Sequence, residues 1–391
     1  MQDKEYKEEN AKLDKILFIS SNYTGNGHKS IIQSLYNQFE KLNQGISIEE
    51  VDAFLLGGVF TKTLSKLYNK VAVFAPRLWG ALYKLGNKIP SLINSFIEST
   101  IKKNFLKLIQ ESKPNLIVTV HPAFIGSIIN ILEKNGLNIP VIVIVADLDN
   151  ISHLWADKRS LYTLCPSKES YNSLVELGIP KDRLRIFGFP TRDIFNHVSA
   201  ENVHIPIACT VDNSRLNFFI MNGSQGGSFS KQISESLLEN FNCNVVILVG
   251  KNTRLKKSLE SYLKPKYPDR ITVYGFTDKV NYYMMNSDIL LIRASPNVLM
   301  EAINLCKPVI ITGSFTGQEE KNPQFVTRNN LGVECEDINK LPQVVRELID
   351  NNGKMLKEIR ESQLKFRQPN AASDIVKFIV SVLQNIKNKR D

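Results

Sequence analysis

The sequence predicts an α/β protein made of two doubly wound parallel sheets, and two observations lead to this fold class. Short, uniformly apolar segments alternate with amphipathic segments of helical spacing along most of the chain. Strands that are apolar on both faces are typical of parallel sheets covered by helices on each side. The alternation stops in a polar stretch at residues 196–217 and then begins again. Because 391 residues are too many for one hydrophobic core, we expect two domains.

The first half of the chain contains candidate strands and helices in strict alternation. The first strand leads into a helix in which Ile31, Leu35 and Phe39 recur at helical spacing. The last helix is expected to end at Gly178 and Pro180, which stop helices. We expect strands at 16–20, 116–120, 141–146, 161–164 and 185–187, and helices at 30–42, 123–135 and 168–177.

The second half repeats the pattern, with strands expected at 218–221, 245–249, 271–273, 289–292 and 309–311 and helices at 230–239 and 298–305. Ligands of doubly wound sheets bind beyond the carboxyl ends of the strands, so we expect the active site in the cleft between the halves. The expected organisation is a flexible tail at 1–14, an N-terminal domain at 15–197, a C-terminal domain at 198–372 and a last helix at 373–391 that packs back on the N-terminal domain.

The composition is that of a globular protein without a membrane span. Hydrophobic residues make up 43% of the chain and charged residues 23%. No apolar stretch approaches the roughly 18–20 residues that cross a bilayer, and the charged N-terminus lacks the apolar core of a signal peptide. The five cysteines have no C-x-x-C spacing, which argues against a zinc site or a disulfide framework and suits a reducing cytoplasm.

The formal charge of +10 fits an anionic partner, such as a membrane surface or nucleic acid, and it fits mere solubility equally well. Residues 53–97 combine basic and apolar side chains without one Asp or Glu. The basic residues are Lys62, Lys66, Lys70, Arg77, Lys84 and Lys88, interleaved with aromatic and aliphatic ones such as Trp79. This mixture in helix-competent sequence is typical of a segment that lies on a membrane surface. The alternatives are a helical excursion that packs on its own domain and a nucleic-acid groove, although no nucleic-acid module accompanies the segment.

The loop Thr24-Gly-Asn-Gly-His28 follows the first strand and precedes a helix. Gly25 and Gly27 would let a ligand approach the backbone, and the amides at the start of the helix would attract an anion. Ser30 replaces the third glycine of the dinucleotide-binding pattern, so that pattern is absent. A neutral His28 at this place can act as a general base; the simpler interpretation is a surface residue or a turn stabiliser.

Two loops of the second half are candidate phosphate sites. Glycines, serines and a glutamine at 222–228 form a candidate anion nest, with a flexible turn as the simpler interpretation. After the strand at 289–292, Ser295 and Pro296 fit the cap and first position of a helix, and Arg293 can pair with a phosphate. Glu301 follows within that helix, where it can reach a ribose or simply face solvent.

Two further clusters of polar residues follow buried strands. Gln318 and Glu319, in the loop at 316–322, can form bidentate hydrogen bonds to sugar hydroxyls, or the loop is merely solvated. Asp147 follows the strand at 141–146, with His153 and Trp155 soon after it. Asp147 can orient His28 or a hydroxyl acceptor, or it can cap the next segment.

Taken in order, these loops resemble a known family of glycosyltransferases. The residues that carry the resemblance are Thr24-Gly-x-Gly-His28, Asp147 with His153-x-Trp155, Gly178-Ile-Pro180, Gly188-x-Pro-x-Arg192, Gly223-Ser-Gln-Gly226, Glu301-Ala302 and Gly317-Gln-Glu-x-x-Asn322. Together they resemble the monogalactosyldiacylglycerol synthase and diacylglycerol glucosyltransferase family, whose members are inverting enzymes of the GT-B fold. That family is related to the lipid-linked N-acetylglucosaminyltransferase of peptidoglycan synthesis, which the 223–226 loop resembles more closely.

The resemblance implies that the second half holds a UDP-sugar. Glu301 would contact the ribose, the loop at 293–298 the pyrophosphate, and Gln318 and Glu319 the sugar hydroxyls. The implied donor residues are Gly223, Ser224, Gln225, Gly226, Arg293, Ser295, Asn297, Val298, Glu301, Gln318, Glu319 and Asn322. The resemblance implies no tightly bound cofactor and no required metal, because helix dipoles and Arg293 would stabilise the departing pyrophosphate.

The resemblance also implies that the first half binds a lipid acceptor, most simply diacylglycerol. His28 would be the general base or would position the acceptor hydroxyl, with Asp147 as a second candidate. The segment 53–97 would attach the protein peripherally to the cytoplasmic face of the cell membrane. The implied residues of the acceptor and membrane side are Gly25, Gly27, Lys62, Lys66, Lys70, Arg77, Trp79, Lys84, Lys88 and Trp155.

Two positions depart from the family pattern. Ala294-Ser295-Pro296-Asn297 stands where a glycine-rich loop is usual, and Ala146 stands where Thr usually precedes Asp147. The first leaves open a changed donor affinity or donor identity, and with the second a changed acceptor or a reduced activity also stays open. The alternative functions are a non-catalytic nucleotide-sugar sensor and a UDP-sugar epimerase. The segment 53–97 speaks against an epimerase, because a soluble sugar substrate gives no reason for a membrane surface.

Overall fold

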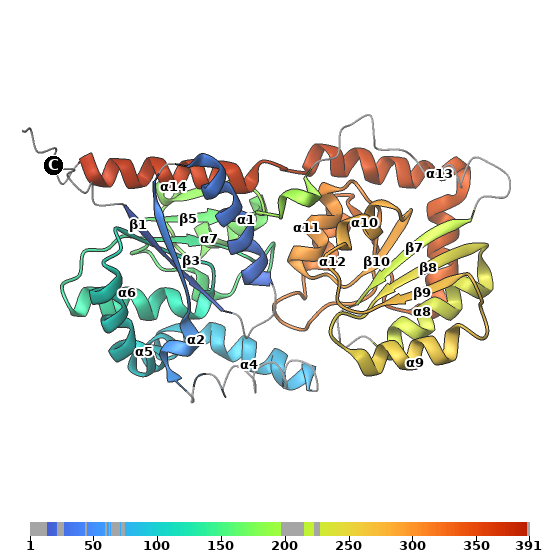
Figure 1. The fold of residues 1–391 in the computed structure, drawn as a ribbon, viewed down its shortest axis with the longest axis horizontal. Helices are drawn as coiled ribbons and strands as arrows, with labels where there is room; N and C mark the ends of the chain where they lie inside the picture. The colour runs from blue at the N-terminus through green and yellow to red at the C-terminus, as the bar shows by residue number, and fades with distance from the viewer. Residues whose placement is uncertain are drawn as a thin grey trace, which may run out of the picture.

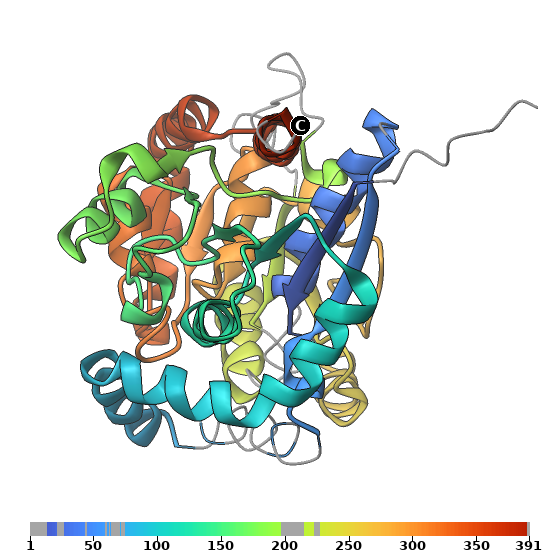
Figure 2. The ribbon, with the colours of Figure 1, turned by 90° about the vertical axis from the view of Figure 1, so that its left-hand side faces the viewer.

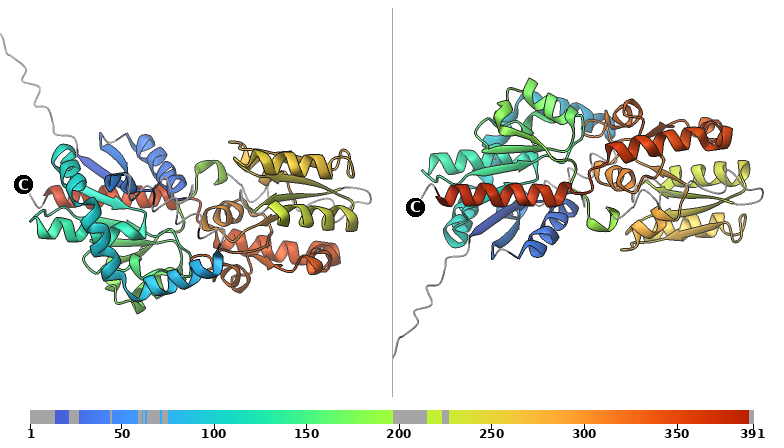
Figure 3. Two further views of the ribbon diagram at one scale, coloured as in Figure 1. Left: turned by 90° about the horizontal axis from the view of Figure 1, so that it is seen from below. Right: turned by 90° about the horizontal axis from the view of Figure 1, so that it is seen from above.

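The computed structural model consists of two α/β domains, each built on a parallel six-stranded sheet (Figure 1). The structure describes residues 14–21, 27–43, 45–58, 61, 63, 71, 75–196, 215–222 and 227–388. The strand order is β2-β1-β3-β4-β5-β6 in the first sheet and β12-β11-β10-β7-β8-β9 in the second. Helices cover both faces of each sheet (Figure 3). The doubly wound α/β class expected from the sequence is therefore confirmed.

The first domain lies at the left in Figure 1. Its strands are β1 (Lys15–Ser20), β2 (Ser47–Asp52), β3 (Leu116–Thr119), β4 (Val141–Ile144), β5 (Tyr162–Cys165) and β6 (Leu184–Ile186). Its helices are α1 (Gly27–Leu42), α2 (Ala53–Leu56), α4 (Pro76–Lys88), α5 (Pro90–Ser112), α6 (Ile125–Lys134) and α7 (Lys168–Glu176).

The second domain lies at the right in Figure 1. Its strands are β7 (Leu216–Met221), β8 (Cys243–Leu248), β9 (Ile271–Tyr274), β10 (Ile289–Ile292), β11 (Val309–Ile311) and β12 (Gly332–Glu334). Its helices are α8 (Gly227–Asn240), α9 (Thr253–Leu263), α10 (Val280–Met285), α11 (Pro296–Asn304), α12 (Asn322–Arg328) and α13 (Leu341–Phe366), and α14 (Ala371–Asn388) follows.

The central strands form where the sequence predicts them because both of their faces are buried. Every residue of β3, β4 and β10 is buried, which accounts for their uniformly apolar sequences. The sequence did not predict β2 and β12, which lie at the edges of the two sheets. β2 contains Glu49 and Glu50 among its six residues, and an edge strand tolerates such charged side chains because one side of it faces solvent.

Two helix starts differ from the sequence prediction in ways that matter for the site. α1 begins at Gly27 rather than at Ser30, so His28 lies in its first turn. The helix expected at 123–135 is a short 3₁₀ turn, Pro122–Phe124, followed by α6. The turn leaves His121 at the carboxyl end of the apolar segment that begins with β3.

The basic segment 53–97 is helical where the structure describes it. Its helices are α2, α4 and the first two turns of α5, and α4 and α5 lie at the bottom of the first domain (Figure 2). Lys62, Lys66 and Lys70 lie outside the described residues, as do nearly all of the tail expected at 1–14 and the residues 197–214 of the linker.

The C-terminal helix α14 lies against the first domain, although the chain reaches it from the second. It runs beside α1 along the top of Figure 1. The Phe378 ring lies 5.0 Å from the Tyr162 ring and 5.3 Å from the Phe187 ring, measured between centroids. Ile375 and Ile379 are buried in the same core. The two domains are thus joined both by the linker before β7 and by this returning helix.

Truncating the buried face of α14 should therefore destabilise the protein. We expect Ile379→Ala to lower the free energy of unfolding by roughly 2–5 kcal/mol, because it leaves a cavity in the core of the first domain. The exposed neighbour Lys377→Ala is the control and should change it by about 0.5 kcal/mol or less. Denaturant unfolding measures both; equal losses in the two variants would contradict the packing of α14.

Candidate active site

The helices that follow β1 and β10 begin opposite each other at the boundary between the domains. Gly27 is the first residue of α1, and it faces the side chain of Asn297 in the first turn of α11. A Cβ atom on Gly27 would lie 2.5 Å from Asn297 Nδ2, which is closer than real Cβ contacts. A larger residue at position 27 would therefore displace the Asn297 side chain of the other domain. The N-terminal ends of two helices, each with a partial positive charge, meet here.

His28 lies next to this contact, in the first turn of α1. Its ring packs against the ring of His121 with a centroid distance of 4.7 Å. Burial lowers the pKa of His28 to about 4, although the backbone of Val120 acts in the opposite direction. The imidazole is therefore neutral at pH 7. Its Nδ1 atom is buried and has no hydrogen-bond partner among the described residues, which suits a group that accepts a proton from a bound hydroxyl.

His121 is a site residue that the sequence analysis missed. Its Nδ1 accepts a hydrogen bond of 3.3 Å from the Ala123 backbone amide, so the neutral ring carries its proton on Nε2. Phe54 and Phe124 pack around the ring, and burial together with the nearby His28 holds the pKa of His121 well below its usual value. The signal was its position directly after the buried residues Leu116–Val120, where strand ends carry function.

Asp147 is buried just beyond β4. Its Oδ2 accepts a hydrogen bond of 2.6 Å from Trp155 Nε1, and Trp155 is completely buried. Burial raises the pKa of Asp147 to about 7; the Trp155 hydrogen bond opposes this rise and the charge of Glu319 adds to it. The charge of Glu319 in the second domain thus acts on the Asp147 carboxyl. The side chain to which Asp147 is hydrogen-bonded is Trp155 and not His28.

Arg293 and Glu319, two predicted donor residues, bind each other in this structure. Arg293 Nε lies 3.0 Å from Glu319 Oε2, and the guanidinium lies 3.8 Å from the centre of the Phe315 ring. Glu319 Oε2 also accepts a hydrogen bond of 3.0 Å from the Phe315 amide. Glu319 is only 3% exposed, so the cation of Arg293 compensates a buried carboxylate.

Glu301 is also held by an arginine, but this one comes from the other domain. Its Oε1 accepts hydrogen bonds from Arg192 Nε at 3.0 Å and Nη2 at 2.8 Å. Burial raises the pKa of Glu301, and the Arg192 charge partly offsets the rise. Arg192 belongs to the Gly188-x-Pro-x-Arg192 motif, to which the sequence analysis gave no role. The contact links the end of the first domain to the candidate ribose site.

The first turn of α11 offers backbone donors to an anion. Ser295 occupies the N-cap position, as expected, but its side chain makes no capping hydrogen bond. The amides of Ala294 and Ser295 are bonded to Gly313 and Arg293 carbonyls. Pro296 has no N–H, which leaves the amides of Asn297 and Val298 as the first donors of the helix.

Two buried amide side chains beside this turn have polar atoms without partners among the described residues. Asn222 accepts a hydrogen bond of 2.8 Å from Thr312 Oγ1, yet its Nδ2 is unpaired. Asn322 donates to the Ala294 carbonyl at 2.8 Å, yet its Oδ1 is unpaired. Buried polar atoms without partners are costly, so both are suited to bind a ligand. Gly223, Ser224, Gln225 and Gly226 adjoin Asn222 but lie outside the described residues, as does Gly25.

The predicted membrane residues that the structure describes lie on α4. Arg77, Lys84 and Lys88 are exposed, and Trp79 is half-buried. The leucines Leu78, Leu82 and Leu85 are 53%, 46% and 52% exposed, and they follow one another at helical spacing. The start of α5 adds Leu92 at 64% and Phe96 at 47%. Among the described helices, none is long and apolar enough to cross a bilayer.

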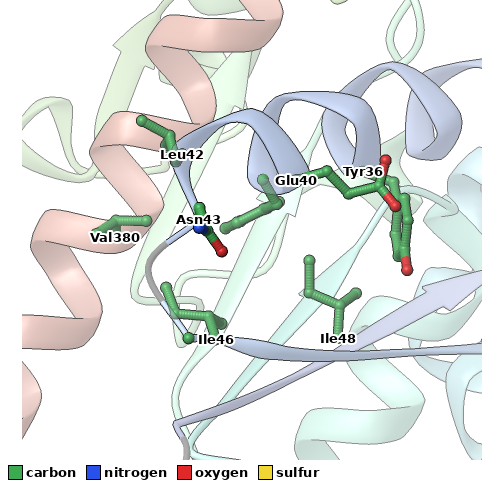
Figure 4. A pocket seen from close by; sticks show the side chains of 9 residues that line it. Tyr36, Glu40, Leu42, Asn43, Ile46, Ile48 and Val380 are labelled. Atoms are coloured by element: carbon green, nitrogen blue, oxygen red, sulfur yellow. The ribbon is translucent and has the colours of Figure 1, made fainter.

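Other features of the described residues lie away from this site. A cavity of about 180 Å³ opens between the end of α1, the start of β2 and α14, and its walls include Tyr36, Ile48 and Val380 (Figure 4). None of the predicted site residues lines it. The described side chains include no group of three or more His, Cys, Asp or Glu placed to hold a metal ion.

Comparison with known families assigns both halves of the chain. Residues 28–191 match the monogalactosyldiacylglycerol (MGDG) synthase family, and residues 217–376 match the glycosyltransferase family 28 C-terminal domain. Monogalactosyldiacylglycerol synthase 3 of Arabidopsis thaliana is 26% identical over 383 residues, which cover 93% of this chain and 81% of that protein. Processive diacylglycerol beta-glucosyltransferase of Staphylococcus aureus (strain MRSA252) is 24% identical over 373 residues, which cover 93% of each chain.

Two solved structures share this architecture over nearly the whole chain. MurG of Acinetobacter baumannii superposes with a TM-score of 0.62 at 13% identity, over 94% of this chain and 99% of that one. MnaA of S. aureus, solved with UDP, superposes with a TM-score of 0.61 at 15% identity, over 95% and 97%. These likenesses establish the GT-B fold. The first half of the chain thus matches the MGDG synthase family and the second half the glycosyltransferase family 28 C-terminal domain, and over 93% of its length the chain is similar to an MGDG synthase and to a diacylglycerol glucosyltransferase.

Proposed function

We propose that this chain transfers a hexose from a UDP-sugar to the hydroxyl group of diacylglycerol, with inversion at the anomeric carbon. The position of His28 carries the proposal, because its unpaired Nδ1 lies beside the contact between α1 and α11. An acceptor in the first domain and a donor in the second would meet at this imidazole. The relatives named as MGDG synthase and diacylglycerol glucosyltransferase support the lipid acceptor, and the UDP complex of MnaA supports the donor.

In the proposed reaction, His28 Nδ1 accepts the proton of the lipid hydroxyl as the hydroxyl oxygen attacks the anomeric carbon. The attack comes from the side opposite the leaving group. The bond from the anomeric carbon to the β-phosphate oxygen breaks, and UDP leaves with the electron pair. Arg293 and the first amides of α11 would stabilise its charge. The negative charge of the bound donor would also raise the pKa of the His28 imidazole, which makes the ring a stronger base.

The donor would be held by the buried carboxylates of the second domain. Glu301 would bind the ribose hydroxyls through the oxygen that Arg192 leaves free, since both Arg192 hydrogen bonds go to Oε1. Glu319 and Gln318 would bind the sugar hydroxyls, with Glu319 giving up its contact with Arg293. UDP-glucose and UDP-galactose are both candidate donors, because they differ in the orientation of one hydroxyl.

The exposed face of α4 and the start of α5 would rest on an anionic membrane surface. Exposed leucines at helical spacing supply apolar contact, and the basic side chains beside them match the charge of anionic lipids. Such a seat would bring the diacylglycerol hydroxyl toward the site from the first domain. We therefore propose peripheral attachment to the cytoplasmic face of the membrane.

The transfer itself is the first test. With diacylglycerol in anionic vesicles, we expect label from UDP-glucose or UDP-galactose to enter lipid, and His28→Ala to reduce the rate at least a hundredfold. Calorimetry should show UDP binding within about threefold of wild type, because the nucleotide contacts lie in the second domain. If no common UDP-sugar yields a lipid product although UDP binds, the sensor alternative replaces the transferase.

The pH dependence distinguishes the two candidate bases. His28, with its pKa near 4, stays unprotonated above pH 5, whereas Asp147, with its pKa near 7, loses its proton only as the pH passes 7. With His28 as base, kcat/KM for the donor should stay within about threefold between pH 5.5 and 8. If kcat/KM instead falls tenfold for each pH unit below 7, and Asp147→Asn abolishes the activity, Asp147 is the base.

Membrane attachment is tested by flotation with vesicles that contain phosphatidylglycerol. Changing Arg77, Lys84 and Lys88 to Gln removes three exposed positive charges, each contributing about 1 kcal/mol near an anionic surface, so binding should fall roughly a hundredfold. The matched control changes the exposed Lys251, Lys257 and Lys354 of the second domain to Gln, which gives it the same net charge as the first triple variant. Equal losses of vesicle binding in both triple variants would show that only the net charge matters and would contradict the attachment through α4.

A further inference from the structure

Helix α4 has two faces with different surroundings. Leu78, Leu82 and Leu85 are on its exposed face. On another face, Gly80 is buried and Tyr83 and Asn87 are half-buried. These three residues are separated by three and four positions, so they lie along one side of the helix. The proposed membrane seat therefore has an inner side that faces the protein.

The inner side of α4 contacts the loop 313–319 of the second domain through two reciprocal glycines. A Cβ atom on Gly80 would lie 2.5 Å from Thr316 Cγ2. A Cβ atom on Gly317 would lie 2.9 Å from Cγ of the Tyr83 ring. Each helix or loop glycine thus makes room for a side chain of the opposite domain. Gly317 also has a φ of +87°, a conformation that favours glycine.

Hydrogen bonds tie the same side of α4 to the loop that follows β4. The Tyr83 hydroxyl donates to the Asn150 carbonyl at 3.2 Å, and the Asn150 side chain donates to the Gly317 carbonyl. Asn87 Oδ1 accepts hydrogen bonds from Ser152 Oγ at 2.8 Å and from the His153 amide at 3.2 Å. One helix therefore contacts both the segment after Asp147 and the loop that carries Gln318 and Glu319.

The position of Gly317 determines where the following two residues lie. Gln318 and Glu319 come directly after it, and Glu319 is already fixed by Arg293 and the Phe315 amide. A shift of α4 toward this loop would displace it, because neither Gly80 nor Gly317 has room for one more carbon atom beside the opposing side chain. The helix that would sit on lipid is thus packed directly on the part of the donor site expected to bind the sugar.

We infer that α4 positions the sugar-binding loop, so that seating on an anionic lipid surface strengthens binding of the sugar part of the donor. Tyr83 and Gly80 are positioning residues that act through Thr316 and Gly317. The inference deepens the proposed function and rests on it for the identity of the donor. If the inference holds, binding to lipid changes the affinity for the UDP-sugar, although the lipid does not contact the nucleotide.

The test compares two glycine substitutions on the same helix. Gly80→Ala places a methyl against Thr316, whereas the control Gly86→Ala places one 3.3 Å from Ile93 Cδ1, within the first domain. Both favour the helix, so neither should hinder folding. Affinities for UDP-glucose, UDP-galactose and UDP are measured by calorimetry, without and with phosphatidylglycerol vesicles that lack diacylglycerol. Flotation on the same vesicles confirms binding.

We expect vesicles to strengthen UDP-sugar binding at least threefold in wild type and Gly86→Ala, but not in Gly80→Ala. UDP binding and flotation should be the same in all three. Thr316→Ser removes the methyl that the new Cβ meets, so Gly80→Ala with Thr316→Ser should regain the effect. Loss of flotation in Gly80→Ala, an unchanged vesicle effect, or absence of rescue would each overturn the inference.

Failure of the proposed function gives a different result. A chain that transfers no sugar to lipid but still binds UDP-sugar more tightly on vesicles refutes the transferase and supports the α4 contact. If the chain transfers sugar but its donor affinity does not depend on vesicles, the result supports the transferase and refutes the inferred effect of α4 on donor binding.

Discussion

The site depends on the close approach of two domains at the carboxyl ends of their sheets. Three glycines make this approach possible, because each faces a side chain of the opposite domain: Gly27 faces Asn297, Gly80 faces Thr316, and Gly317 faces Tyr83. A methyl group at any of them would push the domains apart or displace the opposing side chain. The contact brings together the first turns of α1 and α11, and this places His28 beside the N-terminus of the helix that carries Glu301.

The same approach buries charged groups, and each of them has a compensating partner. Glu301 is paired with Arg192 across the domain boundary, Glu319 with Arg293 within the second domain, and Asp147 with the indole N–H of Trp155. A buried charge without such a partner costs several kcal/mol. The two domains can therefore approach this closely only because these partners are present. The partner of Asp147 is a neutral donor, and burial raises the pKa of this carboxyl to about 7 although the Trp155 hydrogen bond opposes the rise.

The sequence predicted what depends on burial and local pattern. Central strands were found because both faces are apolar, and the resemblance of the ordered loops led to the family that the comparisons confirm. The edge strand β2 was missed because Glu49 and Glu50 break its apolar pattern, and with it Asp52, which ends that strand and caps α2. The partners of Arg192 and Arg293 were not predictable either, since they lie 109 and 26 positions away and meet only after folding.

The ion pair of Arg293 and Glu319 gives the departure from a glycine-rich loop a physical consequence. The amides of Ala294 and Ser295 are bonded internally and Pro296 has none, so a pyrophosphate bound as proposed would find few backbone donors before α11 and would depend more on Arg293. In the proposed reaction Arg293 turns from Glu319 to the phosphates. An intact UDP-sugar would then satisfy both partners, because its hydroxyls would bind the carboxylate that Arg293 has left. UDP alone would leave the buried Glu319 with only the Phe315 amide as partner, so on the proposed function the pair would favour binding of the donor and release of the product.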